Sequence, residues 1–169
     1  KLCAEISKWQ RIVIQLPEAG LLRLDHVITF QRRTLSGFWH SSPDTEITIT
    51  PEVTLFQKDE KTYHVTTLHT GLQPLNQAVK TGQTTPVVQG WHSLDFNKRV
   101  PAAALTYHAK IHKPTTFGWL FSPENEHLKL IKLIQSGHSI EVTYLQGTEH
   151  HTLKIELPAA TKALTVKQI

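Results

Sequence analysis

The chain has 169 residues, of which 39% are hydrophobic and 19% charged, a balance typical of one globular domain with a sizeable core and not of a disordered chain. No apolar run approaches the roughly 18 residues that a membrane-spanning helix needs, and the N-terminus lacks the apolar segment of a signal peptide, so no membrane partner is expected. The single cysteine, Cys3, excludes an internal disulfide.

The net charge of +4 comes from the middle third of the sequence. Residues 1–60 and 121–169 are close to neutral, whereas residues 61–120 carry six Lys and Arg against one acid, Asp95. A local excess of positive charge favours an anionic partner. The alternative is that these basic residues are solvated side chains that keep exposed strand edges from pairing with other chains.

The first half of the chain has β-strand patterning throughout. Apolar and polar residues alternate or cluster in short β-branched runs, separated by turn residues such as Pro17–Gly20 and Ser41–Asp44. The charged turn Lys58–Lys61 predicts a hairpin. The strands expected here are 2–7, 9–16, 21–30, 34–40, 46–50, 53–57 and 62–69.

The second half continues the pattern after a polar segment, residues 71–85, which has no clean period and is expected to be a long loop or an irregular crossing. Two strands then flank a polar loop, Asp95–Arg99. The Ser-Pro-Glu sequence at 122–124 could instead start a helix over 124–134, but a strand is favoured. The strands expected here are 86–91, 103–111, 116–121, 128–134, 140–145 and 152–157.

About a dozen short strands with almost no helix predict an all-β fold, an antiparallel β-sandwich that is supersandwich-like. Residues 1–160 are expected to form a single β-sandwich domain, and residues 161–169 a C-terminal tail.

Eleven histidines raise the question of a metal site. His108 and His112 would share one face of a strand, but four residues of strand separate them by roughly 13 Å, too far for one ion. No metal and no cofactor is expected.

No catalytic residue stands out either. The serines lack a nucleophile elbow, Lys80 follows no phosphate-loop pattern, and nothing nominates a pair of carboxylates. Aromatic and basic residues together could bind nucleic acid, but Trp91, Trp119 and Phe121 fall on apolar strand faces, where core packing is the commoner role. No nucleic-acid partner is expected.

The stretch Ile12–Val27 is an apolar strand and a turn followed by the apolar run LLRLDHV. A later stretch contains the Gly90–Ser93 segment, the basic loop after it, Pro101 and the Pro114–Pro123 strand. These two stretches resemble the early and the later strands of the C-terminal β-sandwich domain of bacterial heparinase II/III-like polysaccharide lyases. The resemblance covers residues 5–157 and rests on the order and spacing of these motifs.

The resemblance implies a piece of a lyase that cleaves uronate-containing acidic polysaccharides by β-elimination. In that family a Tyr or His base and an Asn or His that neutralises the carboxylate come mainly from an N-terminal α/α toroid. This sequence has neither the toroid nor the Asp-x-Gly…His-Asn type of stretch that begins the sandwich region, so no catalytic residue is carried over. The implied chain is a fragment or isolated domain, inactive alone, that supports the missing toroid domain, lines one side of the glycan cleft, and works in the periplasm or outside the cell.

Two alternatives remain: a free-standing carbohydrate-binding or adhesion module without catalysis, and an independent β-sandwich enzyme. The candidate contact with acidic polysaccharide, or with the toroid domain, is Lys98 and Arg99 together with Asn97 and His92. The competing interpretation of these residues is a loop that serves solubility alone.

Overall fold

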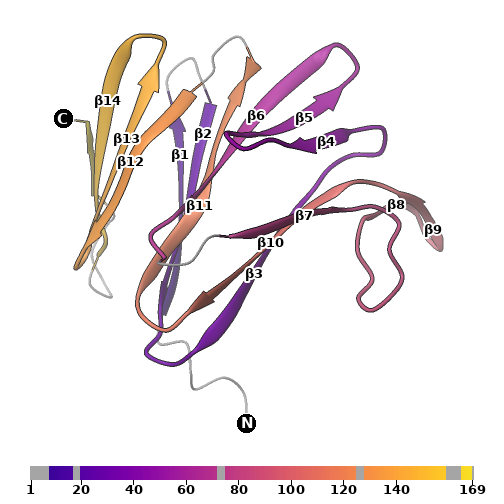
Figure 1. The fold of residues 1–169 in the computed structure, drawn as a ribbon, viewed down its shortest axis with the longest axis horizontal. Helices are drawn as coiled ribbons and strands as arrows, with labels where there is room; N and C mark the ends of the chain where they lie inside the picture. Colours follow the sequence, from indigo (N-terminus) through magenta and orange to yellow (C-terminus); the bar gives the residue numbers. More distant parts are fainter. Residues whose placement is uncertain (1–7, 17–19, 72–74, 125–127, 159–164, 169) are drawn as a thin grey trace.

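The computed structural model describes residues 8–16, 20–71, 75–124, 128–158 and 165–168. These residues form fifteen strands, all paired antiparallel, and contain no α-helix (Figure 1). The predicted all-β sandwich is therefore confirmed. None of the described segments forms a helix long and apolar enough to cross a membrane.

The middle layer of the molecule is a six-stranded sheet. Its strands lie side by side in the order β1 (Lys8–Leu16), β2 (Gly20–Ile28), β11 (Thr115–Pro123), β6 (Lys61–His69), β5 (Thr54–Lys58) and β4 (Glu46–Ile49).

Both faces of this central sheet are covered by other layers, as the burial of its inner strand β11 shows. In β11 the side chains alternate between two hydrophobic cores: Phe117 and Trp119 belong to one, and Leu120 to the other. A strand buried on both faces has no place for the alternating polar residues of a half-exposed strand, so β11 is almost continuously buried. Gly118 is required here because a Cβ would overlap the carbonyl oxygen of Arg23 on β2.

The first covering layer is a four-stranded meander in chain order (Figure 1). Ile140, Val142 and Ile155 on its inner face pack against leucines of β1, β2 and β11. Gly137 and Gly147 have positive φ and make the tight turns of its hairpins. The strands are β12 (Leu128–Ser136), β13 (Ser139–Gln146), β14 (Glu149–Glu156) and β15 (Thr165–Gln168).

The second covering layer is a three-stranded sheet in the order β3 (Arg33–His40), β10 (Ala104–Ile111), β7 (Asn76–Lys80). Its inner face supplies Leu105 and Tyr107, which pack with Phe117 and Trp119 of the central sheet. The Tyr107 ring meets the Trp119 ring edge-on, with 5.1 Å between centroids. Aromatic packing of this kind fixes the distance between the two layers.

A two-stranded hairpin, β8 (Trp91–Asp95) and β9 (Lys98–Pro101), extends away from the layers at the right of Figure 1. Its turn consists of two residues, Phe96 and Asn97, and Asn97 has a φ of 58°. Asparagine tolerates this left-handed conformation better than other residues with a side chain.

Three expectations from the sequence are wrong in detail. The segment 71–85 is not a plain loop, because Asn76–Lys80 forms the edge strand β7, held by packing of Val79 into the core. Residues 86–90 are not a strand, since they bend back to form an isolated bridge between Gln83 and Gln89. The expected polar loop 95–99 is a tight turn whose basic pair already belongs to β9. In these three segments tertiary packing and turn geometry determine the secondary structure, because the local sequence pattern is too weak to do so.

The strand favoured over a helix from residue 128 onward is confirmed as β12. The segment predicted as a tail contains β15, which pairs with β14. The strand expected at 2–7 lies outside the described residues.

Candidate functional site

The four residues singled out from the sequence all lie on the β8–β9 hairpin, but strand alternation divides them. Arg99 pairs in register with Ser93, and His92 with Val100. Successive side chains point to opposite faces, so Arg99 shares a face with Trp91, whereas Lys98 and His92 belong to the other. Asn97 lies in the turn between them. The hairpin therefore presents cations on both faces of a thin ribbon.

Trp91 anchors this hairpin and supports Arg99. The indole Nε1 of Trp91 donates to the carbonyl oxygen of Gln83 at 2.9 Å, which ties the base of β8 to the preceding segment. The Arg99 guanidinium lies over the Trp91 ring, 4.3 Å from its centroid. A stacked guanidinium keeps its N–H edge directed outward, and cation–π contact limits the conformations that it can adopt.

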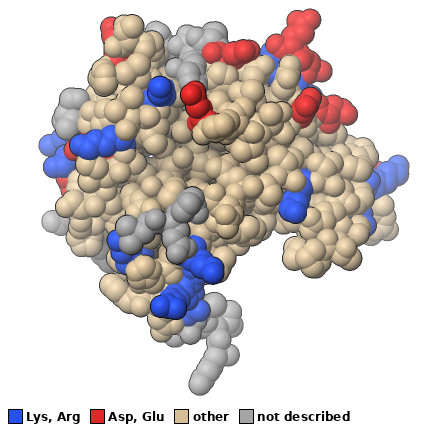
Figure 2. Space-filling view, viewed as in Figure 1, with Lys and Arg blue, Asp and Glu red and all other residues tan. Residues whose placement is uncertain are grey.

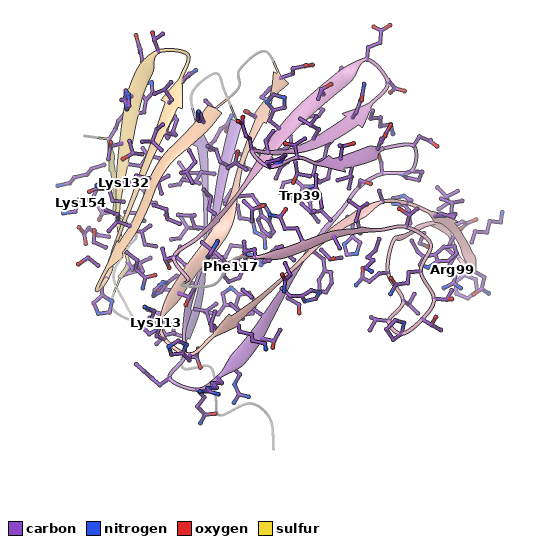
Figure 3. All side chains as sticks on the ribbon, in the orientation of Figure 1. Trp39, Arg99, Lys113, Phe117, Lys132 and Lys154 are labelled. Carbon is purple, nitrogen blue, oxygen red and sulfur yellow. The ribbon has the colours of Figure 1, made fainter. Side chains whose placement is uncertain are left out.

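The cations of the hairpin have no acidic partner among the residues that the structure describes: neither Lys98 nor Arg99 forms an ion pair with any of them. The tip is also apolar, since Leu94 is 62% and Phe96 86% exposed. Figure 3 shows Trp39 and Phe117 between the layers and Arg99 far out on the hairpin. Exposed apolar groups beside unneutralised cations are typical of a contact surface.

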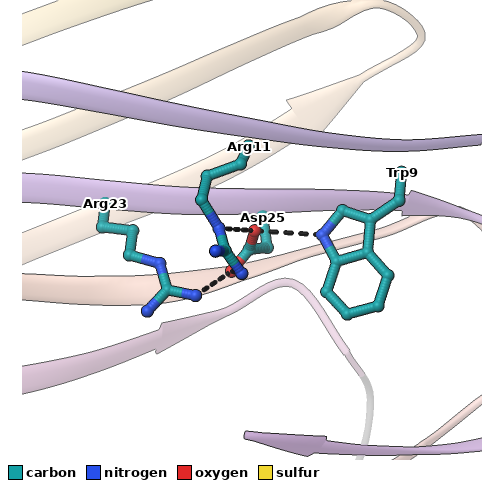
Figure 4. A network of polar contacts seen from close by, with 4 residues as sticks. All are labelled: Trp9, Arg11, Arg23 and Asp25. Carbon is teal, nitrogen blue, oxygen red and sulfur yellow. Dashed lines mark hydrogen bonds and ion pairs between the residues drawn. The ribbon is translucent and has the colours of Figure 1, made fainter. Parts of the chain in front are cut away.

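A second charged group, which the sequence did not single out, is buried in the layer interface (Figure 4). Asp25 of β2 is fully buried. Its Oδ1 accepts hydrogen bonds from Trp9 Nε1 at 3.0 Å and Arg11 Nε at 2.7 Å. Its Oδ2 accepts from Arg11 Nη2 at 3.4 Å and Arg23 Nη2 at 3.0 Å.

This network is built for stability. A buried carboxylate is tolerated only when donors satisfy both oxygens, and here two guanidinium groups and an indole do so. Arg23 in turn lies over the buried Trp119 ring, 4.4 Å from its centroid. The signal in the sequence was the single acid of the run LLRLDHV, with Arg23 two residues before it on the same face of the strand.

A third polar group connects β2, β11 and β12 on the opposite face of the central sheet. The hydroxyl of Thr116 donates to Gln135 Oε1 at 2.7 Å, so it accepts from Nδ1 of His26 at 3.0 Å. Burial lowers the pKa of His26 below its usual value of 6.5, and His138 and Lys8 lower it further. His26 is therefore a neutral structural group at pH 7.

The remaining histidines do not converge. His108 Nδ1 lies 2.8 Å from Ser36 Oγ on the neighbouring strand, and His112 follows the end of β10 and is exposed. Within the described ranges no three His, Cys, Asp or Glu side chains lie close enough together to hold a metal ion. Cys3 lies outside those ranges. Core packing is confirmed for Trp119, whereas Trp91 is half-buried on the hairpin.

Comparison with known structures finds proteins with a similar arrangement of strands. The chain is similar to heparan sulfate lyase HepC from Pedobacter heparinus, with a TM-score of 0.70 and 13% sequence identity, over 95% of this chain and 25% of the lyase. A mutant of that lyase gives a TM-score of 0.66 and 11% identity, over 92% of this chain and 24% of the lyase. No protein-family model and no curated protein matches the sequence.

The chain thus spans about a quarter of the length of the lyase structures that it matches. The resemblance predicted from the sequence is confirmed as a similarity of fold, one that extends over nearly all of this chain.

Proposed function

We propose that this chain is the β-sandwich domain of a heparinase II/III-like polysaccharide lyase that acts outside the cytoplasm. In this role it supports an α/α toroid domain that is not part of the sequence, and its β8–β9 hairpin contacts the acidic glycan or that domain. The observation that carries the proposal is the fold: 95% of the chain superimposes on one quarter of a heparan sulfate lyase. A domain of that size leaves most of such an enzyme to other parts.

The chemistry of the hairpin fits an acidic sugar. A guanidinium offers paired N–H donors that match the two oxygens of a carboxylate or sulfate, and Arg99 is held in place by Trp91. Lys98 adds a second charge, and the amide of Asn97 offers both a donor and an acceptor for hydroxyl groups. His92 lies half-buried on the Lys98 face, opposite to the face of Arg99, and offers its ring to a glycan that contacts that side.

Catalysis is assigned to the toroid domain. β-Elimination needs a base near the proton to be removed and a donor that stabilises the developing negative charge. The buried carboxylate of this chain is fully occupied by its own arginines and cannot serve as that base. We therefore assign to this domain the positioning of a polymeric substrate, not its chemistry.

The alternative, a free-standing carbohydrate-binding module, would be favoured by a flat platform of exposed aromatic rings. The large exposed aromatic side chains of the described residues lie on separate elements, namely Trp9, Phe30, Phe38 and Phe96. The observed ring contacts join none of these four to one another. This dispersed arrangement favours the lyase domain.

The proposal is tested by heparin-affinity elution of the Lys98→Ala/Arg99→Ala variant. Removal of two exposed charges from the contact should weaken binding by roughly 1 to 2 kcal/mol, with a larger effect at low salt. The matched control is Lys129→Ala/Lys132→Ala, which removes equal charge from the outer face of the four-stranded sheet. If both variants elute at the same lower salt concentration, net charge alone is acting and the hairpin is no site.

A further inference from the structure

A second basic surface lies at the other end of the three-stranded sheet. A cavity of about 580 Å³ opens there, and the basic residues of its lining are Arg32, Arg33, Lys110, His112 and Lys113. We call these five residues the basic pocket. In Figure 2 blue side chains gather at the lower end of the molecule with no red among them, and Figure 3 labels Lys113 there.

Strand pairing assembles this pocket from two distant stretches of sequence. Strands β3 and β10 run antiparallel, with Lys110 opposite Thr34 and Ile111 opposite Arg33. The start of β3 therefore lies beside the end of β10, and the pair Arg32-Arg33 meets the run from Lys110 to Lys113. The charge count along the sequence could not reveal this meeting, because the two arginines belong to a segment that is neutral overall.

The pocket is positive without compensation from its own lining. No acidic side chain lines it, and none that the structure describes forms an ion pair with Arg32, Lys110 or Lys113. On the outer face of the four-stranded sheet two lysines do have such partners: Lys132 lies 3.8 Å from Glu141, and Lys154 lies 3.0 Å from Glu156. Like charges held around one cavity repel each other, and a bound anion would relieve that repulsion.

The local structure holds the backbone of the pocket and the Arg33 side chain in position. Ile111 is buried and forms part of the pocket wall. Arg33 Nη2 donates to Gln31 Oε1 at 2.7 Å, which fixes the direction of the guanidinium. Thr115 Oγ1 donates to the carbonyl oxygen of Lys113 at 2.9 Å and closes the bend after β10. Charged donors arranged in advance around a cavity lose less entropy when they bind.

We propose that the basic pocket binds an oxyanion, a sulfate or a carboxylate, and that it does so independently of the hairpin. The eight residues of β10 separate the two surfaces by about 25 Å, so a single acidic group cannot reach both. That the oxyanion belongs to an acidic glycan chain rests on the function proposed above. The capture of an oxyanion itself does not.

The test is calorimetric titration of the full chain with sodium sulfate at constant ionic strength, and separately with a heparin tetrasaccharide. The variant Lys110→Gln/Lys113→Gln changes two exposed side chains and should bind sulfate about tenfold more weakly than the unmodified chain. Arg32→Gln is a second variant, expected to act in the same direction. Lys129→Gln/Lys132→Gln is the control, and it should bind sulfate normally.

The two ligands distinguish the sources of the oxyanion. Weaker binding of both sulfate and tetrasaccharide by the pocket variant supports an acidic glycan, and weaker binding of sulfate alone supports a small free anion at the same site. Unchanged sulfate binding in the Lys110/Lys113 and Arg32 variants overturns the proposal. The hairpin is tested separately by the heparin elution of the Lys98→Ala/Arg99→Ala variant, so a failure of the hairpin proposal is recognised independently of the sulfate titration.

Discussion

Two arginine–tryptophan contacts of nearly equal geometry serve different purposes in this molecule. Arg23 lies 4.4 Å from the centre of the Trp119 ring, and Arg99 lies 4.3 Å from that of Trp91. The first pair lies between two sheets, and its guanidinium also donates to the buried carboxylate of Asp25. The second pair lies on an exposed hairpin, where no acidic side chain of the described chain forms an ion pair with the guanidinium.

The difference shows that an arginine stacked on a tryptophan can serve stability in one place and binding in another. A cation in the layer interface needs a carboxylate, because a buried charge without a partner is costly. A cation on the hairpin is hydrated by water, which a ligand carboxylate or sulfate can replace. The presence or absence of an acid beside the arginine is therefore what separates a structural contact from a candidate binding contact.

The largest expected effect comes from removal of the buried acid. Asp25→Ala leaves two arginines without their shared partner, and the free energy of unfolding should fall by about 3 to 5 kcal/mol. Urea denaturation measures this directly. Asp95→Ala on the hairpin is the matched control, and its loss should stay below about 1 kcal/mol because Asp95 is exposed and its side chain accepts only the amide of Phe96. Similar losses in both variants would remove the distinction between the two regions.

A smaller effect should separate the two arginines themselves. Arg23→Ala deletes a hydrogen bond to a charged group and should cost about 2 kcal/mol of stability. Its elution from heparin should change no more than that of Lys129→Ala, which also removes one positive charge. Arg99→Ala should cost less than about 1 kcal/mol of stability and should lower the salt concentration of elution. The opposite assignment, in which Arg99 carries stability and Arg23 carries binding, would refute the account.

The smallest effect concerns pH and sharpens the contrast between buried and exposed basic groups. The pKa of His26 is lowered in the folded chain, chiefly by burial, so below its unfolded value of 6.5 the unfolded chain binds the proton more readily. Stability should therefore fall as the pH drops below about 6.5 toward the lowered folded pKa. Burial lowers the pKa of His69 in the same direction.

Replacement of His26 by Gln tests this assignment. The variant should lose part of the pH dependence of the unfolding free energy between pH 7.5 and 5. An unchanged pH profile in the His26 variant would show that its burial does not control acid stability.

Much of the fold could be predicted from the sequence because most strands have a recognisable local sequence pattern. Alternating or β-branched runs and the turn residues between them located most of the strands of the two larger sheets. Strand β7 was missed because its residues, Asn76–Lys80, have no clean period and pair with β10 only through the tertiary structure. The hairpin turn was misplaced because the basic pair Lys98-Arg99 looked like loop sequence although it starts a strand.

The candidate site was predictable only where its residues are neighbours in the chain. His92, Asn97, Lys98 and Arg99 lie within one hairpin, but their division between two faces depends on strand register. The basic pocket depends on pairing between β3 and β10, whose facing residues are between 64 (His40 and Ala104) and 78 (Arg33 and Ile111) positions apart. Such long-range pairings are set by the complete fold and leave no local pattern.

The most direct test of the central claim is calorimetric titration of the unmodified chain with a heparan sulfate oligosaccharide and with a neutral oligosaccharide of the same length. Cations without acidic partners should bind the sulfated chain, with an affinity that falls steeply as salt is added, and should not bind the neutral one. Equal binding of both sugars, or no binding of the sulfated sugar even at low salt, would contradict the account.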